Sequence, residues 1–408
     1  MLTSQNASLA LALALFVANA QADSRPNIVF ILADDLSPFA LAAYGNDTCD
    51  TPNIDRLAAE GMVFHGAHHM GSWSGAVCTP SRTMIMTGRT VWRIPGAVGT
   101  PFQRNAEFRR AAAQQSMPAV FNSAGFDTFR TCKKGNSYPE ANELFDESAI
   151  AGFEMRQDPR NSNWHGDRAI EYLHARQENG DADPFLLYFG FTHPHDPRYG
   201  IPELLEKYGA VNEGELTEPN PKAPPLPISY LPAHPFHHGH PGLRDEEHVQ
   251  GVMTRRDEAT VRNELGREYA CIENIDRQIG RVLEKLEAMG ELENTYIFFT
   301  ADHGIAVGRH GLMGKQNLYE HTWRVPLIVR GPGVQPGSET NAMVYLLDLL
   351  PTFCELTNTP IPSAVEGDSF AGVLHGRPDM ARDVVYGVYA GGTKHGIRSV
   401  KPKRWKII

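Results

Sequence analysis

The chain has 408 residues, of which 41% are apolar and 21% charged, so it can bury a large core and does not have the composition of a disordered protein. Its 38 Lys and Arg against 48 Asp and Glu give a net charge of -10, which argues against nucleic acid as the main partner. An anionic substrate would therefore have to be held by a local cluster of cations.

The N-terminus carries the pattern of an export signal. Residues 7–20 form a Leu- and Ala-rich run, and Ala20-Gln21-Ala22 supplies the small-x-small pattern of a cleavage site. No later stretch is long and apolar enough for a transmembrane helix. We therefore predict a signal peptide over residues 1–22 and a secreted or periplasmic protein without a membrane span.

Strand and helix patterns then alternate along the chain. The run Asn27–Ala33 is continuously apolar, as expected for a strand that is buried on both faces of a parallel sheet. Thr51 and Pro52 suit the capping and first positions of a helix that ends at Gly61. The alternation recurs as helices followed by strands at 117–124 and 126–131, at 164–177 and 185–192, and at 261–289 and 296–300, with a further strand at 325–330. This order predicts an α/β sandwich with a large, mixed, mainly parallel sheet between helices.

Composition also suggests how the chain is divided. The stretch 194–255 is rich in Pro, Gly and His, and we interpret it as a long surface excursion near the site. Short alternating segments at 384–389, 397–400 and 405–408 predict the start of a small antiparallel sheet that breaks off in mid-element. We therefore expect a catalytic domain over 23–380 and an incomplete C-terminal subdomain over 381–408.

Five cysteines are too few and too scattered to frame a disulfide scaffold in a chain of this size. Cys132, Cys271 and Cys354 lie inside apolar segments, and we interpret them as small buried hydrophobic residues. Cys49 and Cys78 are the remaining two.

Acidic residues follow two of the predicted strands directly. Asp34 and Asp35 come after the first strand, and Asp302 and His303 come after the strand at 296–300. Ligands collect at the carboxyl ends of parallel strands, so these side chains are expected to converge. Adjacent carboxylates repel unless a cation neutralises them, and Ca²⁺ or Mg²⁺ prefers oxygen ligands. Either acidic segment alone could instead cap the next helix, but the pair favours a metal site.

The segment around Cys78 indicates an anion site. Thr79-Pro80 is typical of a helix start, which would place Cys78 at a helix N-terminus, where backbone N–H groups and the helix dipole favour an anion. Arg82 follows one turn later on the same side, where it could grip an oxyanion or orient a nucleophile.

The segment Cys78-Thr79-Pro80-Ser81-Arg82, with Thr87-Gly88-Arg89 after it, resembles the C-x-P-S-R element of type I, formylglycine-dependent sulfatases of the alkaline phosphatase-like superfamily. In that family the cysteine is oxidised to formylglycine (3-oxoalanine). The resemblance extends from about residue 25 to about residue 330, through landmarks at 25–35, 51–57, 300–304 and 314–327.

This resemblance implies a calcium site and a maturation step. Asp34, Asp35, Asp302 and His303 would hold one Ca²⁺ together with modified Cys78. A formylglycine-generating enzyme would act on the chain. The substrate would be a sulfated carbohydrate or a small organosulfate.

The resemblance also carries over three further side chains. Lys133 stands where the family has the lysine of a Lys-x-His element, with Lys134 as the alternative, but the histidine is missing because Gly135 follows. His195 matches a Pro-His element and could protonate the departing alkoxide. Lys315 resembles a lysine that meets the sulfate or the leaving oxygen. The leaving-group acid is therefore left open between His195, Lys315 and another group.

The implied mechanism begins with attack on sulfur by a hydroxyl of the hydrated aldehyde at residue 78. Calcium, Arg82, Lys133 and Lys315 would stabilise charge on the sulfuryl oxygens, and His195 or Lys315 would protonate the alcohol. The second hydroxyl of the diol would then expel sulfate.

Three rival hypotheses accompany this one. A phosphonate or phosphate ester hydrolase of the same superfamily would use the same residues. A non-catalytic carbohydrate-binding relative would keep Cys78 as a thiol. A cysteine hydrolase using Cys78 and His195 receives no support from the Pro-Ser-Arg sequence after Cys78.

Two weaker signals concern aromatic and basic residues. His234, His237, His238 and His240 could bind a transition metal, but a solvated loop is the better interpretation. Near the Cys78 element, residues expected either at a pocket rim or in the core, with the core slightly preferred, are Trp73, His68, His69, Trp92 and Arg93.

Overall fold

The computed structural model describes residues 25–73, 77–96, 100–214, 216–235, 245, 251–253, 255–377, 382–389 and 396–408. The predicted signal peptide over 1–22 and His237, His238 and His240 of the histidine-rich loop lie outside these residues.

The main sheet has eight strands in the order β5-β4-β6-β1-β7-β8-β2-β9. Its neighbouring strands are parallel except for the two pairs that β8 makes with β7 and β2. The strands are β5 (Glu147–Ala151), β4 (Asp127–Lys133), β6 (Phe185–Gly190), β1 (Asn27–Ala33), β7 (Thr295–Ala301), β8 (Leu327–Arg330), β2 (Met62–His68) and β9 (Ser338–Tyr345). The predicted mixed, mainly parallel sheet is confirmed.

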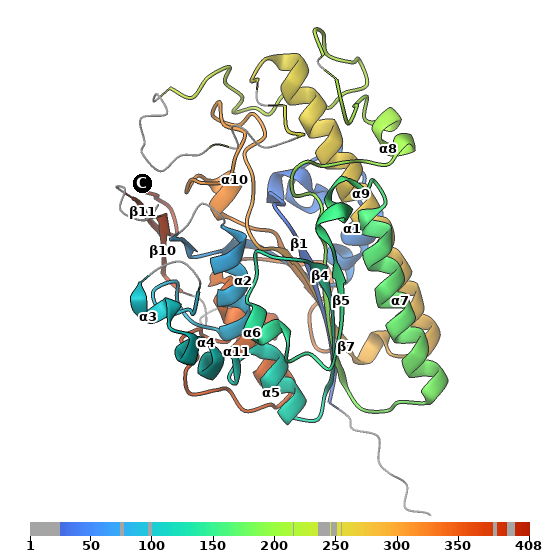
Figure 1. Ribbon diagram of the computed structural model, residues 1–408, viewed down its shortest axis with the longest axis vertical. Helices are drawn as coiled ribbons and strands as arrows, with labels where there is room; N and C mark the ends of the chain where they lie inside the picture. The colour runs from blue at the N-terminus through green and yellow to red at the C-terminus, as the bar shows by residue number, and fades with distance from the viewer. Residues whose placement is uncertain are drawn as a thin grey trace, which may run out of the picture.

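Helices cover both faces of this sheet, as Figure 1 shows. The helices on one face are α1 (Pro52–Glu60), α7 (Asn161–Asn179) and α9 (Glu258–Met289). Those on the other face include α2 (Cys78–Thr87), α5 (Met117–Ser123) and α11 (Leu349–Leu356). Shorter helices are α3 (Pro101–Arg104), α4 (Ala106–Ala113), α6 (Pro139–Asn142), α8 (Pro202–Lys207), α10 (Glu320–Trp323) and α12 (Ala371–Leu374).

Strand β1 lies at the centre of both cores. Val29 and Ile31 point into the core beneath α9, while Phe30 and Leu32 point into the core beneath α11. Successive side chains of a strand face opposite sides, so a strand covered on both faces must be apolar throughout. The continuous apolar run of the sequence is explained by this double burial.

Helix α9 confirms the longest predicted helix and begins three residues earlier than the apolar stripe suggested. Asp257 precedes the first turn, and its side chain accepts a hydrogen bond from the backbone N–H of Thr260 at 3.0 Å. The residues of the predicted stripe are all buried: Ile272, Ile275, Ile279, Val282, Leu283 and Leu286.

The start of α1 differs in detail from the prediction. Thr51 is the N-cap residue, but its hydroxyl makes no capping hydrogen bond. Asp276 of α9 does this instead, since its carboxylate accepts hydrogen bonds from the backbone N–H groups of Asn53 at 3.0 Å and Ile54 at 2.7 Å. A remote side chain therefore caps α1 and ties it to α9, which no local pattern could indicate.

A small sheet joins the C-terminal segment to the main domain. Strands β10 (Val384–Tyr389) and β11 (Ile397–Pro402) are antiparallel, as predicted, and β10 also pairs in parallel with β3 (Gly71–Ser72). The predicted strand at 405–408 is wrong, since Ile407 makes only an isolated bridge to Val400. The pairing with β3 connects this sheet to the segment that precedes Cys78.

Among the described residues, no helix has the length and apolar character needed to span a membrane.

Candidate active site

The two acidic strand ends meet at one edge of the sheet. Strands β1 and β7 are neighbours, with Ala33 opposite Ala301, so the residues that follow them emerge at the same level. The backbone N–H of Asp302 donates to the carbonyl of Ala33 at 3.2 Å, and the N–H of Asp35 donates to the Asp302 carboxylate at 3.2 Å. The convergence expected from parallel strands is thus observed.

Asp35 has a left-handed backbone, with φ of 68°. This conformation is uncommon for a residue with a Cβ atom, and it persists where surrounding contacts enforce it. The hydrogen bond to Asp302 provides one such contact. The turn that it makes places two successive carboxylates, those of Asp34 and Asp35, near the same point.

Cys78 is the first residue of α2 and is fully buried beside these carboxylates. Its Sγ lies 3.5 Å from Oδ1 of Asp34 and 3.2 Å from Nε2 of His303. Potential ligand atoms of Asp34, Asp35, Cys78 and His303 all lie within 4.8 Å of one another. Asp302 belongs to the same cluster, with one carboxylate oxygen 3.7 Å from Nε2 of His303.

Arg82 lies one turn further along α2, completely enclosed. Its Nε donates to Asp302 at 2.9 Å, and its Nη2 lies 3.1 Å from Oδ2 of Asp34. Its Nη1 donates to Sγ of Cys132 at 2.8 Å. In this structure Arg82 therefore holds the two carboxylates in place. The two roles predicted for it, gripping an oxyanion and orienting the nucleophile, stay predictions.

Cys132 is buried in the core, as expected, but its sulfur also accepts a hydrogen bond from Arg82. Burial raises the pKa of its thiol, yet Arg82 and Arg130 outweigh this effect and the net shift is downward. A sulfur that accepts a hydrogen bond from Arg82 helps to fix the guanidinium. Sequence reasoning missed this contact, and its one available signal was the position of Cys132 directly before Lys133.

The structure distinguishes the two candidate lysines at the end of β4. Lys133 is buried, forms an ion pair with Asp34 and lies 3.8 Å from Sγ of Cys78. Lys134 is exposed, and its ammonium group lies over the ring of Phe153. Successive side chains of a strand alternate in direction, so only Lys133 can face the site.

Lys315 and His195 approach from two other loops. The ammonium group of Lys315 lies 2.5 Å from Oδ2 of Asp35 and 3.9 Å from Sγ of Cys78. Nε2 of His195 lies 3.9 Å from the same Asp35 oxygen. All nine side chains selected from the sequence therefore come together: Asp34, Asp35, Cys78, Arg82, Lys133, His195, Asp302, His303 and Lys315.

Asp196 is a site residue that sequence reasoning missed. Its backbone carbonyl accepts a hydrogen bond from Nδ1 of His195 at 2.7 Å, and its carboxylate lies 3.0 Å from the same nitrogen. The carboxylate is also 3.9 Å from the ammonium group of Lys315. Asp196 therefore orients the His195 ring and links the two basic loops.

Helix α9 supports the loop that carries His195. Arg267 donates to the carbonyl groups of Pro197 and Arg198, the latter at 3.3 Å. Arg198 in turn lies 3.1 Å from Glu264 of the same helix. These ion pairs and hydrogen bonds are buried, so loss of one partner would leave an uncompensated charge.

The electrostatics of the cluster are uneven. Burial and Asp302 raise the pKa of Asp34, but Lys133 and Arg82 outweigh them and bring it to about 2. For Asp35 burial is stronger than the attraction of Lys315 and His303, and the pKa rises to about 6. Two neighbouring carboxylates therefore differ in how well protein cations compensate them.

Two other groups in the site are held neutral. Burial raises the pKa of the Cys78 thiol well above its ordinary value, despite the nearby lysines. Burial, together with Lys133 and Lys315, lowers the pKa of His195 well below its ordinary value. An unmodified thiol of this kind is a poor nucleophile, because the thiolate is the reactive form. The structure therefore offers no support for a cysteine hydrolase.

The cluster suits a bound divalent cation. Four carboxylates, those of Asp34, Asp35, Asp196 and Asp302, surround three permanent cations, those of Arg82, Lys133 and Lys315. Three of the carboxylates are completely buried. Oxygen donors favour Ca²⁺ or Mg²⁺, whereas a thiol and an imidazole favour softer metals. The metal preference of the site therefore depends on whether residue 78 offers an oxygen or a sulfur atom.

The other residues flanking the Cys78 element divide into two groups. His68 and His69 are buried, and Trp73 is half-buried. Trp92 and Arg93 are exposed at the surface. The preferred core interpretation is therefore confirmed for the two histidines and wrong for Trp92 and Arg93.

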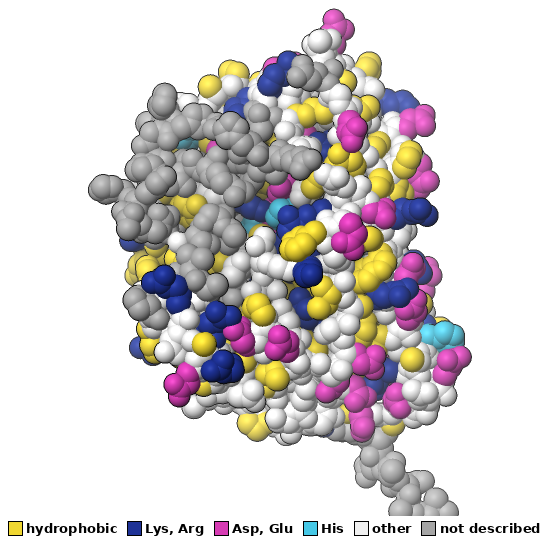
Figure 2. Space-filling model, in the orientation of Figure 1, with side chains coloured by type: hydrophobic (Ala, Val, Ile, Leu, Met, Phe, Trp, Pro, Cys, Tyr) yellow, Lys and Arg dark blue, Asp and Glu magenta, His cyan; other side chains and the backbone are white. Residues whose placement is uncertain are grey.

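On the face of the molecule that is in view in Figure 2, the described charged side chains form no single track. Figure 2 shows basic and acidic side chains interspersed over one face of the molecule. Cations are gathered in the enclosed cluster of Arg82, Lys133 and Lys315.

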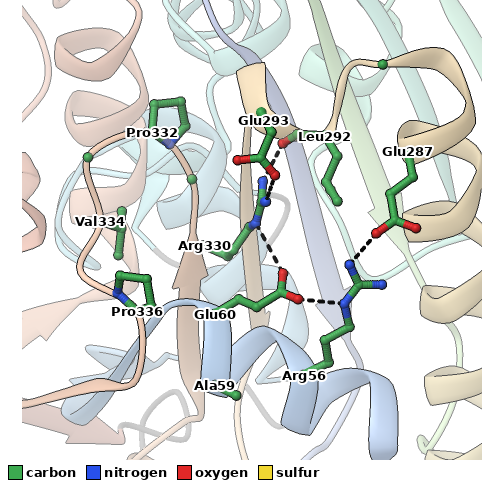
Figure 3. Close-up of a pocket in the computed structure, with 13 residues that line it drawn as sticks. Arg56, Ala59, Glu60, Glu287, Leu292, Glu293, Arg330, Pro332, Val334 and Pro336 are labelled. Atoms are coloured by element: carbon green, nitrogen blue, oxygen red, sulfur yellow. Dashed lines mark hydrogen bonds and ion pairs between the residues drawn. The ribbon is translucent and has the colours of Figure 1, made fainter.

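A separate cavity of about 580 Å³ lies at the opposite end of β7. Figure 3 shows Glu60 between Arg56 and Arg330 there, with Glu287 and Glu293 as further partners of the two arginines. Its charges are thus paired with one another. Ligands of open α/β sheets bind at the carboxyl ends of strands, which is the other end of this molecule.

Comparisons with known proteins agree with the geometry. The family model described as Sulfatase matches residues 26–359. N-acetylglucosamine-6-O-sulfatase of Bacteroides thetaiotaomicron is 26% identical, with 94% of this chain and 78% of that protein covered. Iduronate 2-sulfatase of Mus musculus is 25% identical, with 84% and 71% covered.

Solved structures share the fold. A protein in complex with its substrate D-glucosamine-2-N,6-O-disulfate superposes with a TM-score of 0.71 at 23% identity, covering 94% of this chain and 88% of that one. A phosphonate monoester hydrolase from Silicibacter pomeroyi gives 0.73 at 19% identity, covering 94% and 86%. The family model spans most of the chain, and its residues include both acidic strand ends and the Cys78 element. The chain is therefore an enzyme of the sulfatase family, with an alkaline phosphatase-like fold.

Proposed function

We propose that this enzyme releases inorganic sulfate from a sulfated carbohydrate and that Cys78, once oxidised to formylglycine, supplies the nucleophile. The observation that carries the proposal is the position of Cys78. It begins α2, beside the carboxylates of Asp34 and Asp35 and within 4 Å of the ammonium groups of Lys133 and Lys315. A maturation enzyme would have to carry out the oxidation.

Charge balance supports a sulfate ester as the ligand. The four carboxylates of the site exceed its three cations by one. A bound divalent cation would reverse this to one net positive charge, which matches the single negative charge of a sulfate ester. A cavity of net positive charge concentrates an anionic substrate and stabilises charge on its oxygens.

Two groups complete the proposed site. Ca²⁺, held by Asp34, Asp35, Asp302 and His303, would compensate the carboxylates and polarise the sulfuryl oxygens. Formylglycine at residue 78, as its hydrate, would offer an oxygen nucleophile in place of a thiol that burial keeps protonated.

The side chains of this chain divide the remaining tasks. Lys133 and Lys315 lie 3.8 and 3.9 Å from Sγ of Cys78, which suits contacts with the oxygens of a sulfuryl group beside it. Arg82 orients Asp34 and Asp302. His195 lies outside this inner group, where an alkoxide that leaves away from residue 78 could receive a proton.

The carbohydrate part of the proposal rests on relatives. Those named N-acetylglucosamine-6-O-sulfatase and iduronate 2-sulfatase are sulfatases named for sugar units. The predicted signal peptide over 1–22 would place this enzyme where extracellular polysaccharides occur. The sugar and the position of the sulfate are not part of the proposal.

The test is a screen of defined sulfated oligosaccharides for released sulfate, with Cys78→Ala as the control. We expect release by the wild type and loss of at least about 1000-fold in the variant, because the nucleophile is absent. Intact mass should show residue 78 lighter than cysteine, as the aldehyde requires. Equal sulfate release by both proteins would show that the nucleophile is wrongly assigned.

The phosphonate hydrolase alternative is tested with matched esters. The neighbour from Silicibacter pomeroyi shares the fold, so fold alone does not separate the two activities. We expect higher kcat/KM on 4-nitrophenyl sulfate than on a 4-nitrophenyl phosphonate. The reverse order would favour the alternative.

A further inference from the structure

A second cavity, of about 520 Å³, is lined by none of the residues assigned to the catalytic site. This volume is in the range of sites for small ligands. Its walls come from the segments that follow β1 and β7, the same segments that carry the acidic strand ends, together with residues 225–229. Its lining includes the rings of Phe39, His310, Tyr319 and His321 and four charged side chains, those of Asp47, Arg309, Glu320 and Lys406.

One wall of this cavity is a set of neighbouring rings that are tilted toward one another. The ring of His310 lies 4.9 Å from that of Tyr319 and 5.4 Å from that of His321, with interplanar angles of 32° and 35°. His234 extends the set, with Nε2 3.3 Å from the hydroxyl of Tyr319. Rings of this kind combine an apolar face with polar edges, which is the chemistry that sugar rings require of a binding surface.

A buried arginine lines the same cavity. Arg309 is only 8% exposed, and its guanidinium lies 5.4 Å from the centre of the Phe39 ring and donates to the carbonyl of Ala306 at 3.2 Å. Among the described residues it forms no ion pair with a carboxylate within 4 Å, although it interacts electrostatically with Glu268. A planar guanidinium placed in this way retains capacity to bind two oxygens of an anion such as a sulfate group.

The backbone that presents these side chains is constrained. Val307, Gly308, His310 and Gly311 all have positive φ, from 40° to 84°. Backbone of residues 229–233 holds the loop: the N–H of His310 donates to the carbonyl of Ser229 at 2.8 Å. Strain of this kind persists where the surroundings over-determine it, and it is concentrated at binding and catalytic sites.

Two cations act on the rings. Burial lowers the pKa of both His310 and His321, and the cations Arg309 and Lys406 lower them further. Lys406 forms an ion pair with Glu320, which is itself compensated by Lys401. Arg309 and Lys406 thus balance the two carboxylates of the lining, those of Asp47 and Glu320, so the cavity has no net negative charge in a chain whose net charge is -10.

We propose that this cavity is a second binding site, which takes a sulfated sugar unit of the glycan while another unit occupies the catalytic site. The ring of the sugar would lie on His310 and Tyr319, and its sulfate would meet Arg309. The proposal rests on the proposed function for its ligand class, a sulfated glycan. It goes beyond that function by assigning a separate site for recognition of the chain.

Binding is measured by calorimetry in the full chain carrying Cys78→Ala, which removes turnover. The probes are tetrasaccharides of heparan sulfate, κ-carrageenan and ulvan, each with a chemically desulfated counterpart. Arg309→Gln should lower the affinity for the sulfated probe that binds best by about tenfold, as loss of one charged hydrogen-bond donor predicts. The desulfated counterpart should bind more weakly, and its affinity should change little when Arg309 is replaced.

Two matched variants act as controls. Arg56→Gln removes an arginine that lines the cavity of Figure 3, where it is paired with Glu60 and Glu287, and it should leave binding unchanged. His310→Phe should retain binding that His310→Ala loses. Residue 310 has φ of 56°, so both substitutions carry the same backbone strain and differ only in the ring. Thermal unfolding of every variant reports whether it is folded.

The proposal is overturned if Arg309→Gln and His310→Ala bind like the parent, if Arg56→Gln weakens binding equally, or if none of the three sulfated probes binds. Sulfate release by the wild type is scored separately. Binding that depends on Arg309 without any sulfate release would support this site while contradicting the proposed function. Sulfate release together with binding that Arg309→Gln does not weaken would support the proposed function and contradict the second site.

Discussion

Lys133 and Lys134 offer a matched pair at the end of β4. Lys133 is buried against Asp34, while Lys134 is exposed. We expect Lys133→Met to lower kcat by about 100-fold or more, because it removes a preorganised cation beside the reacting group. Lys134→Met should change kcat by no more than about twofold, as for an ordinary surface position.

The measurement is steady-state turnover of 4-nitrophenyl sulfate by both variants, with calorimetric confirmation that each is folded. A loss of activity in Lys134→Met equal to that in Lys133→Met would contradict the assignment.

His195 and Lys315 are the two candidates for the leaving-group acid. In-line displacement puts the leaving oxygen away from residue 78. Lys315 and His195 both lie near Asp35 and Asp196, but of the two only Lys315 contacts Cys78, at 3.9 Å. We therefore expect His195 to protonate the alkoxide. The ring is neutral in the free protein, and the negative charge of a bound sulfate ester would favour its protonation.

Ester reactivity separates the two roles. Nitrophenolate leaves readily without a proton, whereas a sugar alkoxide does not, so His195→Ala should lose about tenfold more kcat/KM on a sugar sulfate than on 4-nitrophenyl sulfate. Lys315→Met should lose similar factors on both esters. The opposite pattern would make Lys315 the acid.

Most residues of the catalytic cluster could be predicted from the sequence, but the residues that hold them in place could not. Asp34, Asp302 and Cys78 were accessible because strand ends and a helix start can be read locally. Cys132 and Asp196 were not, since their roles depend on contacts with Arg82 and His195 that only the folded chain creates.

The elements show where local patterns suffice. Strands buried on both faces, such as β1 and β7, were predicted from their continuous apolar runs. Strands β2 and β9 were missed, because β2 contains Gly66 and two histidines and β9 begins with polar residues at the sheet edge. Strand β8 was predicted, but its antiparallel direction was not. It follows from the return of the chain after β7 without a long crossover helix.

One ion-pair cluster ties the C-terminal segment to helix α10. Glu320 pairs with Lys401 at 2.7 Å and with Lys406 at 2.9 Å. Burial alone would raise the pKa of Glu320, but the two ammonium groups lower it from 4.5 to about 2. A folded pKa below the unfolded one means that the contribution to stability is present above about pH 4.5 and is lost as the pH falls toward 2.

Glu320→Gln should therefore destabilise the protein by about 2 kcal/mol at pH 7, a value discounted for the partial exposure of the cluster. The difference from the wild type should shrink between about pH 5 and pH 3. Urea unfolding followed by tryptophan fluorescence at pH 7, 5 and 3 measures it.

Asp383→Asn provides the control for this measurement, since Asp383 and Lys403 form an exposed pair of the same segment. Such a pair contributes little to stability. A destabilisation by Glu320→Gln that is the same at pH 7 and pH 3 would show that the ion pairs are not its source.

For the whole molecule, the sheet order places three of the six site segments at the ends of adjacent or nearby strands, and a helix and two loops bring the others. Residues 34–35 follow β1, residues 302–303 follow the adjacent β7, and Lys133 ends β4, which is separated from β1 only by β6. Helix α2 and the loop of Lys315 then close the cluster from two sides. The fold class and this edge of the sheet could be predicted from the sequence, whereas the second cavity, formed by segments distant in sequence, could not.

Metal binding should act on the stability of the entire fold. Asp34, Asp35 and Asp302 are completely buried and mutually repulsive, so a cation that binds only the folded protein stabilises it. At a Ca²⁺ concentration about 100 times its Kd, this contribution is about 2.7 kcal/mol, which for a chain of this size raises the Tm by about 3 °C.

The experiment treats the protein with a chelator, removes the chelator and records Tm as Ca²⁺, Mg²⁺ or Zn²⁺ is added. We expect the largest rise with Ca²⁺, and loss of that rise in Asp35→Asn, while Asp383→Asn keeps it because its carboxylate lies on the surface. A rise with Zn²⁺ alone would mean that nitrogen and sulfur donors dominate the site, as they would if His303 and an unmodified Cys78 held the metal. That outcome would contradict both the calcium assignment and the oxidised state of Cys78, because the two depend on the same donor atoms.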